Sequence, residues 1–186
     1  LVLYFFLQKI KDLNDGSWMW ENLLVEERYV LFHRILIHCF HELETLAKAS
    51  NANCGLHEQE QNKVLLDFVH SFFKNVSPSM LTKITFHGSS NAVSVSKLQT
   101  QVLQCVKAWL KRCTENMNSD TDALKVLIDI ANQLTLVKSG PGVDTASLFQ
   151  AHLAAIILGF EISSLQKLGI IPTGVENCLK LFHLMK

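Results

Sequence analysis

The stretch WMWENLLVEERYVLFHRILIHCFHELETLAK, from Trp18 to Lys48, decides the fold, because it runs for 31 residues without a glycine or a proline. Through most of it, apolar residues recur at i, i+3, i+4 and i+7, the spacing that places side chains on one face of an α-helix. That face consists of Phe32, Ile35, Leu36, Cys39, Phe40, Leu43 and Leu46. Burying one large apolar side chain contributes roughly 1.5–3 kcal/mol, so such a helix is expected to pack against neighbours rather than to stand alone.

The ends of this stretch carry turn and capping residues. Ser17 follows Asp15-Gly16 and is the expected N-cap, and the polar run 50–55 is the expected end. The charged triplet at 26–28 leaves two readings open, one long helix or two helices that meet there.

Similar patterns predict helices along the rest of the chain. They cover Leu1–Asn14, His57–Asn75, Met80–His87, Ser96–Met117, Thr121–Lys138, Thr145–Phe160, Ser163–Leu168 and Thr173–Lys186. Ser77 followed by Pro78 is a typical helix start, and Thr173 with Glu176 forms a capping box. Residues 145–160 are apolar nearly all round, which predicts a central helix with neighbours on several sides. The alternation at 93–96 has no partner run, so no sheet is expected.

Composition places the chain in a broad class without naming an activity. Its 186 residues suit a single helical domain, 1–186, and its 48% hydrophobic content and apolar first residues suggest a fragment of a larger helical protein. The 17 basic and 17 acidic residues cancel, which does not favour a dedicated nucleic-acid binder. The apolar run LVLYFFLQKI is too short for a membrane span, which needs ~20 residues. Five scattered cysteines without a CxxC pair indicate a reducing compartment, the cytoplasm or the nucleus.

Repetition along the chain is faint. The segments 37–40, 103–106 and 176–179 each place a cysteine at a similar point of a predicted helix, at Cys39, Cys105 and Cys178. Each gap has room for two helical hairpins of the ~40-residue HEAT or armadillo class, although amphipathic helices also resemble each other by chance.

Two short segments resemble helical-repeat proteins. KLGIIP at 167–172, followed by an amphipathic helix, resembles the entry to the last helix of armadillo repeats. LQCVKAWL at 103–110 resembles the inner helix of some karyopherin-type HEAT repeats. Together they cover about fourteen residues, and the segment TGVE at 173–176 departs from the apolar run of the armadillo consensus. The resemblance implies a HEAT/armadillo-like α-solenoid that works by binding other proteins.

Residues with catalytic or ligand-binding chemistry are scattered. Phosphate-loop, dinucleotide-binding, nucleophile-elbow and zincin motifs are absent from the sequence. The densest ligand-capable group is His33, His38, Cys39 and His41, with Glu42 or Cys54 as further ligands, but Cys39 belongs to the apolar face and His38 and His41 to the polar one. We therefore expect no metal, no cofactor and no catalytic residue.

The candidate partner-binding residues are two tryptophans and a basic strip. Trp18 and Trp20 are two positions apart, so both cannot face one core, and one of them is a candidate anchor for a partner. Lys107, Lys111 and Arg112, which we call the basic strip, are expected to face solvent, opposite the apolar face that contains Trp109.

The sequence thus predicts an all-α protein of antiparallel helices stacked as a HEAT/armadillo-like solenoid fragment, with a closed helical bundle as the alternative. The function it favours is a non-catalytic scaffold that binds a protein or peptide within a larger complex. The alternative is a karyopherin-like transport or small-GTPase-binding regulatory domain, and the third reading is a helical enzyme built on His38 and His41.

Overall fold

The structure of the chain is a computed structural model, which describes residues 29–49, 56–87, 95–115, 121–137 and 145–158. These residues form six α-helices and no strand: α3 (Tyr29–Lys48), α4 (Leu56–Asn75), α5 (Pro78–Thr85), α6 (Lys97–Glu115), α7 (Thr121–Thr135) and α8 (Thr145–Leu158). The all-α prediction is confirmed. The helices predicted at 1–14, 163–168 and 173–186, and the question of one helix or two near residues 26–28, lie outside the described residues.

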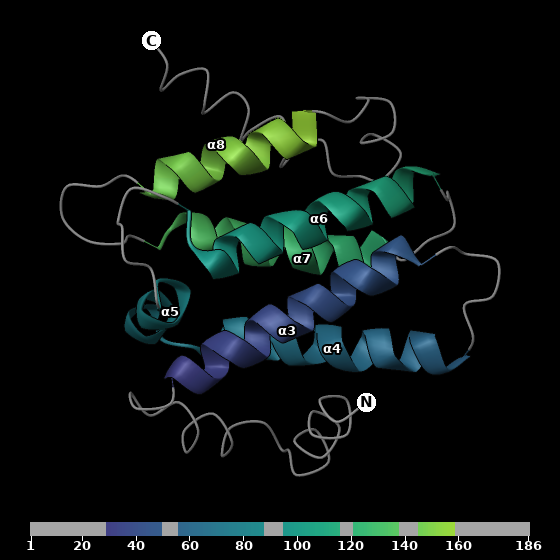
Figure 1. The fold of residues 1–186 in the computed structure, drawn as a ribbon, viewed down its shortest axis with the longest axis horizontal. Coiled ribbons are helices and arrows are strands. Elements are labelled where there is room, and N and C mark those ends of the chain that lie inside the picture. Colours follow the sequence, from purple (N-terminus) through teal and green to yellow (C-terminus); the bar gives the residue numbers. More distant parts are fainter. Residues whose placement is uncertain (1–28, 50–55, 88–94, 116–120, 138–144, 159–186) are drawn as a thin grey trace.

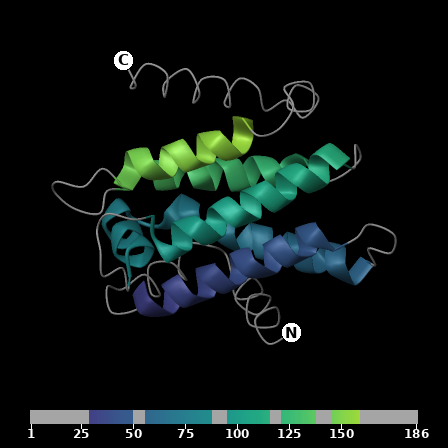
Figure 2. The same ribbon diagram turned by 45° about the horizontal axis from the view of Figure 1, so that its top comes forward.

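The helices are arranged as two pairs and a covering helix (Figures 1 and 2). The chain runs along α3 and returns along α4, then runs along α6 and returns along α7. Helix α3 makes its most extensive contact with α6, and α4 lies against α7. Helix α8 contacts α6 and α7, and the short helix α5 lies at one end, against α3 and α6.

Helices α3 and α6 run in the same direction (Figure 1). Two hydrogen bonds in this interface join residues that are 66 positions apart: the Trp109 indole N–H donates to the Leu43 carbonyl, and the Arg112 guanidinium donates to the Leu46 carbonyl. The cysteine pair Cys39 and Cys105 has the same separation. The faint repetition in the sequence therefore corresponds to two helices that pack in parallel.

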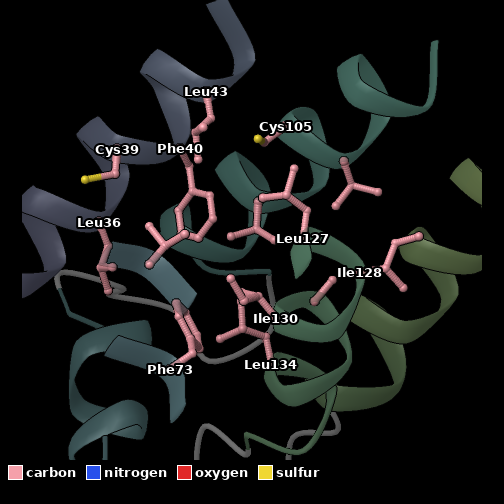
Figure 3. Packing of buried hydrophobic residues seen from close by; sticks show 14 of the residues in the cluster. Leu36, Cys39, Phe40, Leu43, Phe73, Cys105, Leu127, Ile128, Ile130 and Leu134 are labelled. Atoms are coloured by element: carbon pink, nitrogen blue, oxygen red, sulfur yellow. The ribbon is translucent and has the colours of Figure 1, made fainter. Parts of the chain in front are cut away.

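A single hydrophobic core joins both pairs. Figure 3 shows side chains from α3, α4, α6 and α7 that point into the same interior. Phe32 packs on Phe72 with ring centroids 5.2 Å apart, and Phe40 packs on Phe73 at 6.2 Å, so aromatic pairs join α3 to α4. The apolar face predicted for α6 is also confirmed, because Leu98, Val102, Cys105, Trp109 and Cys113 are all buried.

Capping residues fix where two of the helices begin. Ser77 accepts a hydrogen bond from the Met80 N–H at 3.3 Å, with Pro78 as the first helical residue of α5, as predicted. A second cap, which was not predicted, lies at the start of α6. The Ser96 N–H donates to the Gln99 side-chain oxygen at 3.0 Å and the Gln99 N–H donates to the Ser96 hydroxyl at 3.1 Å, which is a reciprocal capping box.

Helix α8 has one buried and one exposed side. Its 14 residues contain no Asp, Glu, Lys or Arg, and a helix of that composition is expected to be surrounded. Phe149, Leu153, Ala154 and Ile157 are indeed buried against α6 and α7. The opposite side is exposed, so α8 lies at the outside of the described helices; the prediction of neighbours on several sides also depends on residues 159–186, which lie outside the described residues.

Candidate partner-binding surfaces

The residues predicted to bind a partner separate into three groups. Trp18 and Trp20 lie outside the described residues. Lys107 and Lys111 are exposed on α6, as predicted, and the Lys111 ammonium lies 3.8 Å from the Glu115 carboxylate. Both side chains of that pair are mostly exposed, so the contact contributes little to stability and Lys111 stays accessible.

Arg112 does not face solvent with the two lysines. Its guanidinium donates to the Leu46 carbonyl at 2.5 Å and lies 5.2 Å from the centre of the Trp109 ring. The reason is helical spacing: Arg112 follows Trp109 by three residues and so lies on nearly the same side of α6. The prediction that Arg112 faces away from the core was wrong, and the basic strip reduces to Lys107 and Lys111.

The α3–α6 interface carries further polar contacts beside Arg112. The Gln101 amide donates to the Glu44 carboxylate at 2.6 Å, and the same carboxylate is paired with Lys48 one turn along α3. The Trp109 N–H, in a fully buried ring, donates to the Leu43 carbonyl at 3.0 Å. The segment 103–110, which resembles a karyopherin-type helix, therefore contributes its tryptophan to the core.

A concave surface lies beside these contacts, between α3 and the first turns of α6. It encloses about 380 Å³, and its polar lining consists of His33, Arg34, His38, His41, Lys97 and Gln101. We call it the α3–α6 pocket. Arg34, His38 and His41 follow one another at i, i+4 and i+7 along one face of α3, and Lys97 and Gln101 are i and i+4 on α6. Helical spacing thus gathers two permanent cations and three imidazoles, and the lining contains no carboxylate.

His33 forms the buried wall of this pocket. Its Nδ1 lies 2.6 Å from the Ile84 carbonyl oxygen, which can only accept, so Nδ1 carries the proton and donates. Its ring also packs edge-on against His87, with centroids 5.1 Å apart. Burial lowers the pKa of His33; the hydrogen bond to Ile84 opposes this shift, and the nearby His87, Lys97 and Arg34 add to it. His33 is therefore held as a neutral donor that ties α3 to the end of α5.

The histidine and cysteine cluster considered for a metal does not form one ligand set. His33 and Cys39 are buried, whereas His38 and His41 are exposed on the polar face of α3. Among the residues that the structure describes, no group of three or more His, Cys, Asp or Glu side chains is placed to hold a metal ion. Cys54 and its predicted role as a further ligand lie outside the described residues.

The buried cysteines are also unsuited to act as nucleophiles. Burial raises the pKa of the Cys39 thiol, and Glu42 raises it further. Burial likewise raises the pKa of Cys105, with Glu44 as the second cause. Both thiols therefore stay protonated near neutral pH, and the thiolate is the reactive form.

The outward face of α8 is a second accessible surface. It consists of Leu148, Ala151, His152, Ala155 and Leu158, which follow one another at helical spacing, and Leu148 and Leu158 are 37% and 58% exposed. We call it the α8 face. Two leucines stand at its ends and two alanines at its centre. An elongated apolar surface of this kind is typical of a protein-binding site rather than of a solvated helix.

None of the helices in the described ranges is long and apolar enough to cross a membrane. No protein-family model, curated protein sequence or solved structure matches this chain.

Proposed function

We propose that this protein is a non-catalytic helical scaffold that binds a partner protein, and that the partner contributes an amphipathic helix to the α8 face. The observation that carries the proposal is the composition of α8: a helix of 14 residues without a formally charged side chain, of which one side is exposed. A solvated helix normally carries charged residues on its outer side.

The shape of the α8 face favours a helix as the bound element. Ala151 and Ala155 are one turn apart at its centre, and small side chains there allow the backbone of a second helix to approach closely. From Leu148 to Leu158 the face extends ~15 Å at 1.5 Å per residue, which matches the three apolar anchors of a bound amphipathic helix. Covering the exposed parts of the two leucines contributes roughly 2 kcal/mol of the binding free energy.

The arrangement of the helix pairs supports a repeat scaffold of the HEAT/armadillo kind as the finer description of the fold. Adding 66 to the residue numbers of α3 (Tyr29–Lys48) gives 95–114, which coincides closely with α6 (Lys97–Glu115). Adding 66 to α4 (Leu56–Asn75) gives 122–141, which overlaps α7 (Thr121–Thr135). In this proposal α3 and α4 form one unit, α6 and α7 form the next, and α8 continues the stack.

Photocrosslinking tests the proposed function. A benzophenone amino acid replaces Ala155 in the full chain, and the matched control carries it at Asp129, an exposed position on α7. We expect the Ala155 probe to join one partner at an amphipathic helical segment and the Asp129 probe not to. A synthetic peptide of that segment should bind the purified chain, and Ala151→Arg should weaken the binding at least tenfold without lowering the melting temperature. A crosslink to a second copy of this chain or to another part of the same chain would contradict the proposal, as would peptide binding that Ala151→Arg does not change.

A further inference from the structure

We propose that the α3–α6 pocket binds a phosphate group. Its distinguishing feature is the convergence of Arg34 from the second turn of α3 and Lys97 from the start of α6 on one concave surface. Arg and Lys side chains brought together from two helices are a typical arrangement for recognising phosphate, because a dianion gains from both charges at once.

The charges in the pocket have no counterion among the described residues. In the described part of the chain, Lys48 is paired with Glu44, Lys111 with Glu115 and Lys125 with Asp122, whereas neither Arg34 nor Lys97 forms an ion pair with a described residue. The nearest buried carboxylate, Glu44, is held by Lys48 and by the Gln101 amide. The positive potential of the pocket is therefore available to an incoming anion.

Imidazole donors complete the site. His38 and His41 line the same concavity, and an imidazole ring offers an N–H donor to a phosphate oxygen. Lys97 is also the first residue of α6, so the positive end of that helix dipole adds to the same side of the pocket. At about 380 Å³ the pocket lies at the lower end of the range for small-ligand sites, which suits a phosphate group and the atoms next to it better than a whole nucleotide.

The proposal is independent of the α8 face, because the two surfaces share no residue. It is tested by following backbone amide signals of the full chain in NMR titrations at constant ionic strength. The probes are inorganic phosphate, a blocked phosphoserine derivative and a blocked glutamate derivative of similar size. We expect saturable shifts centred on Arg34, His38, His41 and Lys97 with both phosphates, and at least tenfold weaker binding of glutamate.

Matched variants separate a built site from general attraction by positive charge. Arg34→Gln and Lys97→Gln should each weaken phosphate binding about tenfold, the effect of losing one charge-assisted contact. Lys107→Gln and Lys111→Gln remove the same charge from exposed positions of α6 that do not line the pocket, and they should change the affinity less than twofold. Tighter binding of phosphoserine than of inorganic phosphate would identify a phosphorylated partner as the source of the group, and equal binding would identify the free ion. Shifts that never saturate, or equal losses in all four variants, would overturn the proposal.

Discussion

Replacing Arg112 by alanine should destabilise the protein, whereas the same change at its neighbour Lys111 should not. The guanidinium donates to the Leu46 carbonyl near the C-terminal end of α3 and packs on the Trp109 ring. A hydrogen bond to a charged group contributes about 1.5 kcal/mol at the lower end of its range, and a partly exposed cation–π contact about 0.5 kcal/mol. The expected loss for Arg112→Ala is therefore about 2 kcal/mol in the free energy of unfolding.

Urea denaturation measures this difference directly. With a slope of about 2.5 kcal/mol per molar, a loss of about 2 kcal/mol lowers the midpoint by about 0.8 M. Lys111→Ala should shift the midpoint by less than ~0.2 M, because an exposed ion pair between side chains one turn apart contributes about 0.3–0.5 kcal/mol or less. A double-mutant cycle with Trp109→Leu, which removes the aromatic ring, should give a coupling energy of about 0.5 kcal/mol between positions 109 and 112. Equal midpoints for Arg112→Ala and Lys111→Ala would refute the assignment of Arg112 to the α3–α6 interface.

Three further predictions concern buried polar groups. Because the pKa of His33 is lowered in the folded state, the unfolded chain takes up the proton first. The contribution of His33 to the free energy of unfolding should therefore be full above pH ~6.5 and fall as the pH drops below it. Subtracting the pH dependence of unfolding of His33→Gln from that of the native chain should isolate this fall. A difference that does not change with pH would contradict the prediction. In urea denaturation, Ser96→Ala should lower the free energy of unfolding by about 1 kcal/mol. Gln99→Ala should lower it by about 2 kcal/mol, because this change leaves the buried Ser96 N–H without its acceptor. Two variants with unchanged stability would argue against the capping box. Iodoacetamide at pH 8 should leave Cys39 and Cys105 unlabelled in the native protein and label both in denaturing urea. Peptide mass mapping measures the labelling of each cysteine. Rapid labelling of either cysteine in the native protein would contradict its burial.

Helical periodicity was sufficient to predict the buried faces but not the polar contacts between helices. The apolar residues of α3 and α6 were predicted from spacing alone, because burial of one face repeats every 3.6 residues. His33 was missed as a core residue, although it lies at i−3 from Leu36 and i−7 from Phe40, on the buried side of α3. Its role depends on the Ile84 carbonyl, 51 residues away, and no local pattern in the sequence indicates which carbonyl a buried imidazole will reach.

The two candidate surfaces differ in how far the sequence could predict them. The charge-free composition of α8 was visible in the sequence, but the side of α8 that packs on α6 and α7 was not, because composition does not show which neighbours the fold supplies. The α3–α6 pocket could not be predicted at all, since it depends on the crossing of two helices whose lining residues are some 60 positions apart. Arg34 and Lys97 belong to separate amphipathic patterns, and only the packing of α3 on α6 brings them to one surface.

The parallel packing of α3 on α6 also sets the sign of the electrostatic field at each end of this interface. Two antiparallel helices place the positive end of one beside the negative end of the other, whereas two parallel helices place like ends together. In α3 and α6 the N-terminal ends lie on the same side, and the pocket into which Arg34 and Lys97 converge there has no carboxylate among its described lining residues. Toward the C-terminal ends, the exposed carbonyls attract positive charge, and there Arg112 of α6 binds the Leu46 carbonyl of α3 while Lys48 lies in the last turn. Two parallel helices thus create an anion-attracting end and a cation-binding end, and the α3–α6 pocket lies toward the end at which an added anion is favoured.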